Sequence, residues 1–237
     1  MSNKVHYEQT GAVAVLRLDD GKANAVSHEL IADITAALER ASDEASAVVI
    51  AGRPGRFSAG FDLAAMTASA DAARALVTAG CELLLRLYVH PQPVVAACTG
   101  HALAAGALLL LTADRRIGAA GDFKVGLNEV AIGLRLPVFG VELARERLSK
   151  RHFTAATVLG RVYAPQEAAD AGYLDLVVEP ERVLAVALAE AEALAQLPRG
   201  ALSQTKLLAR GALVEHVRAT LEDDMSRIVP PTAARKV

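Results

Sequence analysis

Two segments of the chain are rich in small residues, and each follows a predicted strand. They comprise residues 53–63 and residues 99–106. Backbone N–H groups in such segments can approach a ligand closely because few side chains stand in the way. The second segment leads into an apolar helix, whose first turn carries unpaired N–H donors and the positive end of the helix dipole. Together the two segments could form an oxyanion hole, although the first alone is equally well interpreted as a tight loop between a strand and a helix.

One carboxylate, that of Glu129, lies among apolar residues in the segment 126–133. Burial in such surroundings would raise its pKa towards neutrality, the range in which a group can both take and return a proton. The alternative is an exposed or helix-capping glutamate, and the local residues alone favour that alternative. A proton carrier at Glu129 is therefore a hypothesis that needs a structural context.

Ser58, Asp62 and His101 are the residue types of a nucleophilic triad. Ser58, however, does not lie in the G-x-S-x-G turn that exposes a nucleophilic serine, and His101 is better explained by loop packing. Asp62 and Asp114 are predicted to accept backbone N–H bonds at helix starts. The chain also has no P-loop and no G-x-G-x-x-G between a strand and a helix, so nucleotide hydrolysis and dinucleotide binding have no support.

The elements that must position these residues follow from hydrophobic periodicity. Strands are predicted at residues 13–18, 47–51 and 94–98, and amphipathic helices from the N-cap Ser27 through Leu38 and over residues 71–87. Beyond Leu136 the pattern is almost wholly helical, at residues 137–148, 150–159, 165–171, 180–197 and 202–225. Alternating strands and helices favour an α/β fold, and the tail from residue 229 onward is expected to fray.

Composition limits the classes of function. The chain has 237 residues, is 53% hydrophobic and carries a formal net charge of -2, which fits one soluble domain, or one plus a small appendage, without affinity for nucleic acid. Residues 87–113 contain no Asp, Glu, Lys or Arg, but prolines and polar residues interrupt them, so no membrane span is expected. The N-terminus shows no apolar signal region, which favours a cytoplasmic protein. Cys81 and Cys98 have no partners at ligand spacing, so neither a disulfide framework nor a metal site is expected.

Several short motifs occur in one order along the chain. They are residues 22–27 (KANAVS), 57–63 (FSAGFDL), 93–102 (PVVAACTGHA), 113–116 (ADRR) and 128–133 (NEVAIG), followed by the helix-then-strand segment 168–178 (AADAGYLDLVV). This series resembles the crotonase, or enoyl-CoA hydratase/isomerase, superfamily over about residues 13–178. Any one motif is weak evidence, but their common order makes the resemblance specific.

The resemblance implies a spiral of ββα units over residues 1–178, followed by a C-terminal helical region, residues 179–237, that serves oligomerisation. It further implies an enzyme of fatty acid metabolism, acting as an isomerase or a lyase on an acyl-CoA thioester. Coenzyme A belongs to that substrate, and no other cofactor and no metal are expected. A homotrimer or homohexamer is expected as the assembly, with no nucleic-acid or membrane partner.

The resemblance also assigns roles to residues. The backbone N–H groups of Phe61 and Ala105 would hold the thioester oxygen, although the family more often has glycine at the latter position. The backbone around Lys22 would line coenzyme A, and of the nearby cations only Lys22, rather than Arg53, Arg56 or Lys124, is expected at its phosphates. The full set expected to bind substrate is Lys22, Ala23, Ala25, Ala59, Gly60, Asp62, Leu63 and Leu108.

Leu108 marks a departure from the hydratases of the family. Those enzymes carry two glutamates that hold and activate a water, and the first aligns with Leu108 while the second aligns with Glu129. A single carboxylate beside an apolar wall fits proton shuttling, so the pattern is similar to Δ3,Δ2-enoyl-CoA isomerases. Leu108, Leu134 and Leu136 are expected to keep water out. A hydratase that uses one carboxylate and a non-catalytic acyl-CoA-binding protein stay open as alternatives, and the segment 221–237 does not reproduce the family's C-terminal pattern.

Overall fold

The computed structural model describes residues 4–228, and its largest element is a mixed sheet of six strands. The strands β1 and β2 pair antiparallel, and every later pair in the sheet is parallel. Three of the strands have the bounds expected from periodicity. In spatial order the strands are β1 (Val5–Thr10), β2 (Val13–Leu18), β3 (Ala47–Ala51), β5 (Val94–Cys98), β7 (Arg115–Ala119) and β9 (Leu176–Val178).

A second, smaller parallel sheet runs beside the first. Its strands are β4 (Gly55–Ser58), β6 (Gly100–Leu103) and β8 (Val125–Gly126). Each follows directly on a strand of the large sheet, so the pairs β3–β4, β5–β6 and β7–β8 repeat one strand–strand–helix unit along the chain. This repetition confirms the expected spiral of ββα units.

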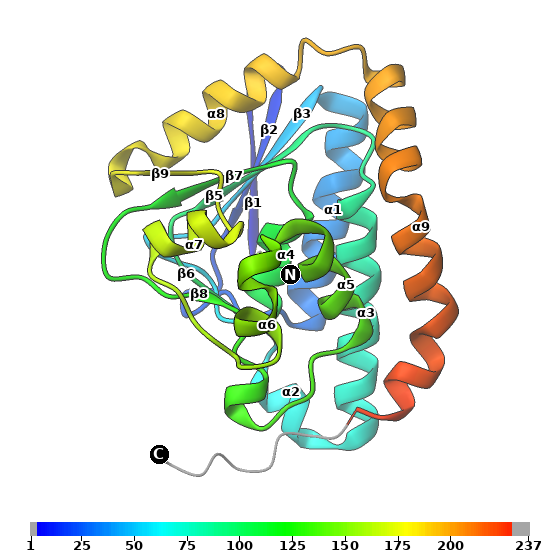
Figure 1. Ribbon diagram of the computed structural model, residues 1–237. Coiled ribbons are helices and arrows are strands. Elements are labelled where there is room, and N and C mark those ends of the chain that lie inside the picture. The colour runs from blue at the N-terminus through cyan, green and yellow to red at the C-terminus, as the bar shows by residue number, and fades with distance from the viewer. Residues whose placement is uncertain (1–3, 229–237) are drawn as a thin grey trace.

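Helices cover both faces of the large sheet (Figure 1). One face packs on α1 (His28–Glu44), α3 (Ala70–Tyr88) and α4 (Ala105–Thr112), and the other on α8 (Val183–Leu194). Strand β3 shows how both faces become apolar: Val48 and Ile50 belong to the first core, whereas Val49 belongs to the second, beneath α8. Because successive side chains of a strand point to opposite faces, this strand is an unbroken apolar run.

Helix α1 begins where the sequence predicts. Ser27 is its N-cap, and the Ser27 hydroxyl accepts the Leu30 N–H at 3.2 Å. The apolar positions Leu30, Ile34 and Leu38 are all buried against the sheet, as their spacing requires.

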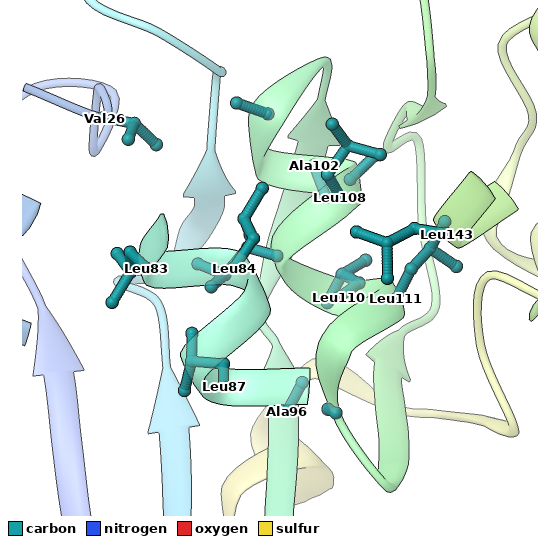
Figure 2. Close-up of a cluster of buried hydrophobic side chains, with 14 of the residues drawn as sticks. Val26, Leu83, Leu84, Leu87, Ala96, Ala102, Leu108, Leu110, Leu111 and Leu143 are labelled. Carbon is teal, nitrogen blue, oxygen red and sulfur yellow. The ribbon is translucent and has the colours of Figure 1, made fainter. Parts of the chain in front are cut away.

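The uncharged stretch 87–113 forms the centre of the molecule. It contains β5, β6 and α4, and all eight residues of α4 are buried. Figure 2 shows Leu108, Leu110 and Leu111 of α4 in one apolar cluster with Leu83 and Leu84 of α3. Its lack of charge therefore follows from burial in a core. No helix among residues 4–228 is long and apolar enough to cross a membrane.

The chain beyond Leu136 is largely helical, as expected, with β9 as the exception that the family resemblance anticipated. The remaining helices are α2 (Leu63–Ala68), the 3₁₀ helix η1 (Val130–Ile132), α5 (Val138–Arg147), α6 (Lys150–Thr157), α7 (Pro165–Ala171), the 3₁₀ helix η2 (Pro180–Arg182) and α9 (Arg199–Ser226). The division at residue 178 falls just after β9 and stays a prediction. The expected fraying of residues 229–237 lies outside the described residues.

Asp114 does not start a helix, contrary to the prediction. It lies just before β7, where its Oδ2 accepts the Val94 N–H at 2.8 Å and the Lys206 Nζ at 2.7 Å, and its Oδ1 lies 2.9 Å from Arg210. Lys206 is buried and also donates to the carbonyl oxygens of His90 and Gln92. The aspartate therefore joins the start of β5 to α9, a long-range contact that local sequence does not reveal.

Candidate active site

A cavity of about 370 Å³ lies beside α4, which contributes Leu108 to its wall, and is lined mainly by apolar side chains. Glu129 is the only carboxylate among the described residues that line it. Such a cavity, apolar with few polar groups, is the usual form of a small-molecule site. The lining residues are Phe61, Met66, Val77, Leu108, Glu129, Gly133, Leu134, Arg135, Pro137, Phe139, Arg227 and Ile228.

Glu129 follows β8 and directly precedes η1, so a strand end and a short helix fix its backbone. Its carbonyl accepts N–H bonds from Ile132 and Leu134. The residue is only 8% exposed, and within residues 4–228 its Oε2 has no hydrogen-bond partner. Burial raises the pKa of Glu129 to about 7, against a smaller lowering effect of its own backbone N–H. The structure thus favours the buried carboxylate over the exposed glutamate that local sequence suggested.

Ala105 is the first residue of α4. Ala104 before it has φ 50 and ψ -125 and supplies no side-chain cap, so the helix begins abruptly from β6. In the part of the chain that the structure describes, the Ala105 N–H has no acceptor. A free N–H at the positive end of a helix dipole suits an oxygen that becomes negative during a reaction.

An isolated parallel β-bridge between Val26 and Phe61 fixes the backbone that carries the Phe61 N–H. The Val26 N–H donates to Gly60 O at 2.8 Å, and the Asp62 N–H donates to Val26 O at 3.1 Å. Because the backbone groups of successive residues in extended chain point to opposite sides, the Phe61 N–H points away from Val26. It too lacks an acceptor within residues 4–228.

Glycines bring these two donors together. A Cβ atom placed on Gly60 would lie 3.4 Å from the Ala105 nitrogen and 2.8 Å from the Ala104 Cβ, and one on Gly106 would lie 2.3 Å from the Ser58 carbonyl oxygen. Gly60 also has φ +96, which side chains disfavour. The loop before α2 and the start of α4 are therefore in direct backbone contact, and this contact juxtaposes the two segments predicted to form an oxyanion hole.

The segment of Lys22, Ala23 and Ala25 is joined to the same loop. Ala59 N–H donates to Ala23 O at 3.0 Å, and the Ser58 hydroxyl donates to Asn24 O at 2.7 Å. These hydrogen bonds place residues 22–25, predicted to line coenzyme A, next to the loop of Phe61, predicted to form part of the oxyanion hole.

Asp20 and Asn24 hold this segment in shape, and sequence reasoning missed both. Asp20 accepts the N–H groups of residues 22, 24 and 25. Burial alone would raise the pKa of Asp20, but these donors hold its pKa below the ordinary value. Asn24 has φ 52, and its side-chain amide donates to the Leu18 and Phe57 carbonyls. The available signal was the cluster of Asp, Gly and Asn, residue types that build turns.

The other predicted substrate-binding residues divide into two groups. Leu108 lines the cavity and is almost fully buried, whereas Leu63 is 64% exposed at the start of α2. Asp62 caps α2 by accepting the Ala65 N–H at 3.1 Å, the structural role predicted for it. Leu134 lines the cavity, but Leu136 does not. It packs on α5 at Gly140, so of the three leucines expected to exclude water only Leu108 and Leu134 face the cavity.

Ser58 and His101 take part in structural hydrogen bonds rather than in a triad. The Ser58 hydroxyl donates to Asn24 O, and His101 Nδ1 accepts the Lys124 N–H at 3.0 Å. The His101 ring also meets Phe123 edge-on. These contacts match the loop-packing role that sequence favoured for His101.

The two residues that follow the C-terminal helix α9 line the cavity, which sequence motifs did not indicate. Asp224, only 3% exposed, pairs with Arg135 at 2.7 Å and accepts the Val138 N–H at the start of α5. This ion pair fixes the end of α9 on the cavity wall, where Arg227 and Ile228 follow. Among the described residues, no cluster of His, Cys, Asp and Glu could hold a metal ion.

Known proteins resemble this chain both in sequence and in structure. A family model described as enoyl-CoA hydratase/isomerase matches residues 8–229. Human mitochondrial enoyl-CoA delta isomerase 1 is 31% identical over 230 residues, covering 95% of this chain and 76% of that protein. The probable enoyl-CoA hydratase EchA17 of Mycobacterium tuberculosis is 30% identical over 202 residues, with coverage of 84% and 77%. A solved structure of an enoyl-CoA hydratase/isomerase family protein from Pseudomonas syringae has a TM-score of 0.94 and 42% identity, covering 96% of this chain and 99% of that one.

Proposed function

Because the chain belongs to the crotonase, or enoyl-CoA hydratase/isomerase, superfamily of enzymes, we propose that it is a Δ3,Δ2-enoyl-CoA isomerase that uses Glu129 as its proton shuttle. The main support for the proposal is that Glu129 is the only carboxylate among the described residues that line the cavity, whose wall includes Leu108. Adding water across a double bond requires a base for the water and a proton source for carbon. Moving a double bond requires one group that takes a proton and returns it elsewhere.

In the proposed reaction, the Glu129 carboxylate removes a proton from C2 of a 3-enoyl-CoA. The electrons of the broken C–H bond delocalise into the thioester and the adjacent double bond, giving a dienolate. Glu129, now protonated, returns the proton to C4, and the double bond is left between C2 and C3. Glu129 ends the reaction in its starting protonation state, so neither water nor a second carboxyl group takes part.

The dienolate oxygen is proposed to lie between the N–H groups of Phe61 and Ala105. Support comes from the two unused donors and from the close contact between their loops. Preorganised donors of this kind act without rearrangement as charge develops, and removing one typically lowers turnover by about 10²- to 10³-fold. The apolar wall formed by Leu108 and Leu134 would strengthen these electrostatic interactions by excluding water.

The raised pKa of Glu129 suits a group that must both accept and donate. A carboxyl group with the ordinary pKa of about 4 would be a weak base towards carbon acids. With its pKa at about 7, Glu129 is a stronger base and is still half ionised near neutrality. Burial thus supplies the acid–base property that the single-carboxylate mechanism requires.

Coenzyme A is proposed to run along the backbone of Lys22, Ala23, Ala25 and the Ala59–Leu63 loop, with the acyl chain in the apolar cavity. The hydrogen bond from Ala59 to Ala23 supports this path because it joins both segments beside the oxyanion donors. This chemistry needs no cofactor beyond the coenzyme A of the substrate. Assembly as a homotrimer or homohexamer is part of the proposal.

The test is to supply the protein with matched 3-enoyl and 2-enoyl thioesters and to identify the products. The proposal expects conversion of 3-enoyl-CoA to 2-enoyl-CoA. Formation of 3-hydroxyacyl-CoA from the 2-enoyl substrate as the main activity would instead identify a hydratase. Tight binding of both esters without turnover would identify a non-catalytic acyl-CoA-binding protein.

A further inference from the structure

Gly80 lies in the interior of α3, a helix of 19 residues, and is buried. Glycine in the middle of a helix is less favourable than alanine because it loses more backbone freedom on folding. The left-handed backbone that often explains a glycine is not present here. The reason for glycine at this position must therefore lie in packing.

The ring of Phe61 occupies the space where a side chain at position 80 would lie. A Cβ atom placed on Gly80 would be 2.4 Å from Phe61 Cε1 and 2.6 Å from Cζ, whereas Cδ1 would be 3.7 Å away. The first two distances are too short for any real contact, and the third is ordinary van der Waals contact. Only the outer end of the ring thus depends on the absence of a side chain at Gly80.

Phe61 is consequently held from two directions. Its backbone is paired with Val26 on one side, and its ring lies against α3 at Gly80 on the other. One small interior gap is lined by Phe61, Gly80 and Ala105, together with Val26, Leu83 and Leu84. Figure 2 shows the last three of these side chains in the core. Phe61 is half-buried and also lines the larger cavity, so its ring is not enclosed on every side. A side chain at position 80 would therefore displace the ring, and we expect that displacement to shift the paired backbone that carries the Phe61 N–H.

We propose that Gly80 is a positioning residue for the oxyanion hole: by leaving room for the Phe61 ring against α3, it fixes the Phe61 N–H beside the Ala105 N–H. This inference rests on the proposed function, because it assigns the role of Gly80 to the same oxyanion site. It adds a residue that lies outside every motif of the family resemblance and that does not line the larger cavity.

The chain offers a matched control and a specific rescue. Gly80→Ala adds one methyl group in conflict with the ring, whereas Gly211→Ala adds the same group in α9, where nothing lies within 4 Å. Phe61→Leu, combined with Gly80→Ala, should relieve the conflict, because leucine ends at its δ carbons and keeps the backbone N–H. A general loss of helix packing would not be repaired by shortening one side chain in a different loop.

Three measurements separate positioning from folding. They are kcat for 3-enoyl-CoA, the Kd of a saturated acyl-CoA, and the infrared stretching frequency of the bound thioester carbonyl, which falls when donors polarise the bond. Gly80→Ala should lower kcat by at least about tenfold, part of the loss expected for one oxyanion donor, with Kd changed less than about threefold. The carbonyl shift should shrink in Gly80→Ala relative to the wild type, whereas adding Gly80→Ala to Phe61→Leu should leave the carbonyl shift and kcat at the level of Phe61→Leu alone. Gly211→Ala should match the wild type.

The inference is overturned if Gly80→Ala keeps the wild-type kcat and carbonyl frequency, or if it lowers kcat and the carbonyl shift as much in the Phe61→Leu background as in the wild type. If Gly80→Ala does not fold, Phe61→Ala, which keeps the N–H and removes the ring, must still reduce the carbonyl shift; an unchanged frequency would also overturn it. A wild-type protein that fails to isomerise 3-enoyl-CoA refutes the proposed function instead, and the carbonyl frequencies then decide the role of Gly80 separately.

Discussion

Leu108 of α4 and Glu129 after β8 line the same cavity, so an apolar side chain and a buried carboxyl group lie on the wall of one space. The family resemblance aligns Leu108 with the position of the first glutamate of hydratases, an alignment that stays a prediction. The cavity wall is further closed by Leu134 and Phe139. The relation between these two residues therefore bears most directly on the type of reaction.

Leu108→Glu should add hydration of 2-enoyl-CoA and lower the isomerisation rate. The new carboxyl group would hold a water near the substrate and would also admit water to the apolar wall. Because Leu108 is almost fully buried, the change should lower the free energy of unfolding by roughly 2–4 kcal/mol. Product analysis with both substrates measures the first effect, and Leu108→Gln, which lacks the carboxylate, is the control. A folded Leu108→Glu protein with wild-type isomerisation and no hydration would contradict this interpretation.

The pH dependence of kcat/KM should report the ionisation of Glu129. The carboxylate must be deprotonated to remove the C2 proton, and burial raises its pKa to about 7. The rate should therefore increase as the pH rises through about 7 and then level off. Initial rates at limiting substrate between about pH 5 and pH 9 would show this. A profile that levels off near the ordinary carboxyl pKa would show that Glu129 is exposed to water.

Glu129 should make the fold less stable as the pH rises. Its pKa is raised in the folded state, from the ordinary value of 4.5 to about 7, so its folded form binds the proton more tightly than the unfolded form. The stability that this proton contributes is present below pH 4.5 and is lost as the pH rises through about 7. Relative to wild type, Glu129→Gln should therefore gain up to about 3 kcal/mol between low and high pH. Denaturant unfolding of both proteins at two pH values measures this, and a pH-independent difference would be inconsistent with a buried carboxylate.

The Asp114–Lys206 pair should be important for stability rather than for catalysis. Burial lowers the pKa of Lys206, while Asp114 opposes that shift. Asp114→Ala leaves the buried ammonium group without its carboxylate and should cost about 3–5 kcal/mol. Lys206→Met should be milder, and adding it to Asp114→Ala should recover part of the loss. As a control, breaking the exposed Glu39–Arg86 pair should cost less than about 1 kcal/mol. Equal losses at both pairs would contradict the role assigned to Asp114.

The sequence was sufficient for elements whose pattern is local. Strands β3 and β5 are unbroken apolar runs, β2 is apolar except for Arg17, and Ser27 is a clear cap for α1. Strand β7 was missed because it begins with two arginines, and the structure shows that one of them, Arg116, is buried and paired with Asp175 at 2.6 Å. The short strands β4, β6 and β8 are stable only through one another, so no single segment could reveal them.

The site, like the fold, could be predicted from the sequence only where its residues lie in local motifs. The segments around Phe61, Ala105 and Glu129 could be identified from motifs that resemble a family. The burial of Glu129 could not, because it depends on α4, α5 and the end of α9 packing around one cavity. Asp224 and Arg135, which fix the end of α9, lie far apart in sequence and carry no motif.

If Glu129 alone carries the proton, Glu129→Gln should lose turnover of a 3-enoyl-CoA. The glutamine keeps the size of the side chain and removes the base, so kcat should fall by at least about 10³-fold while the Kd of a saturated acyl-CoA stays within about threefold of wild type. Turnover within about tenfold of wild type, in a folded protein that binds the ester normally, would contradict the account.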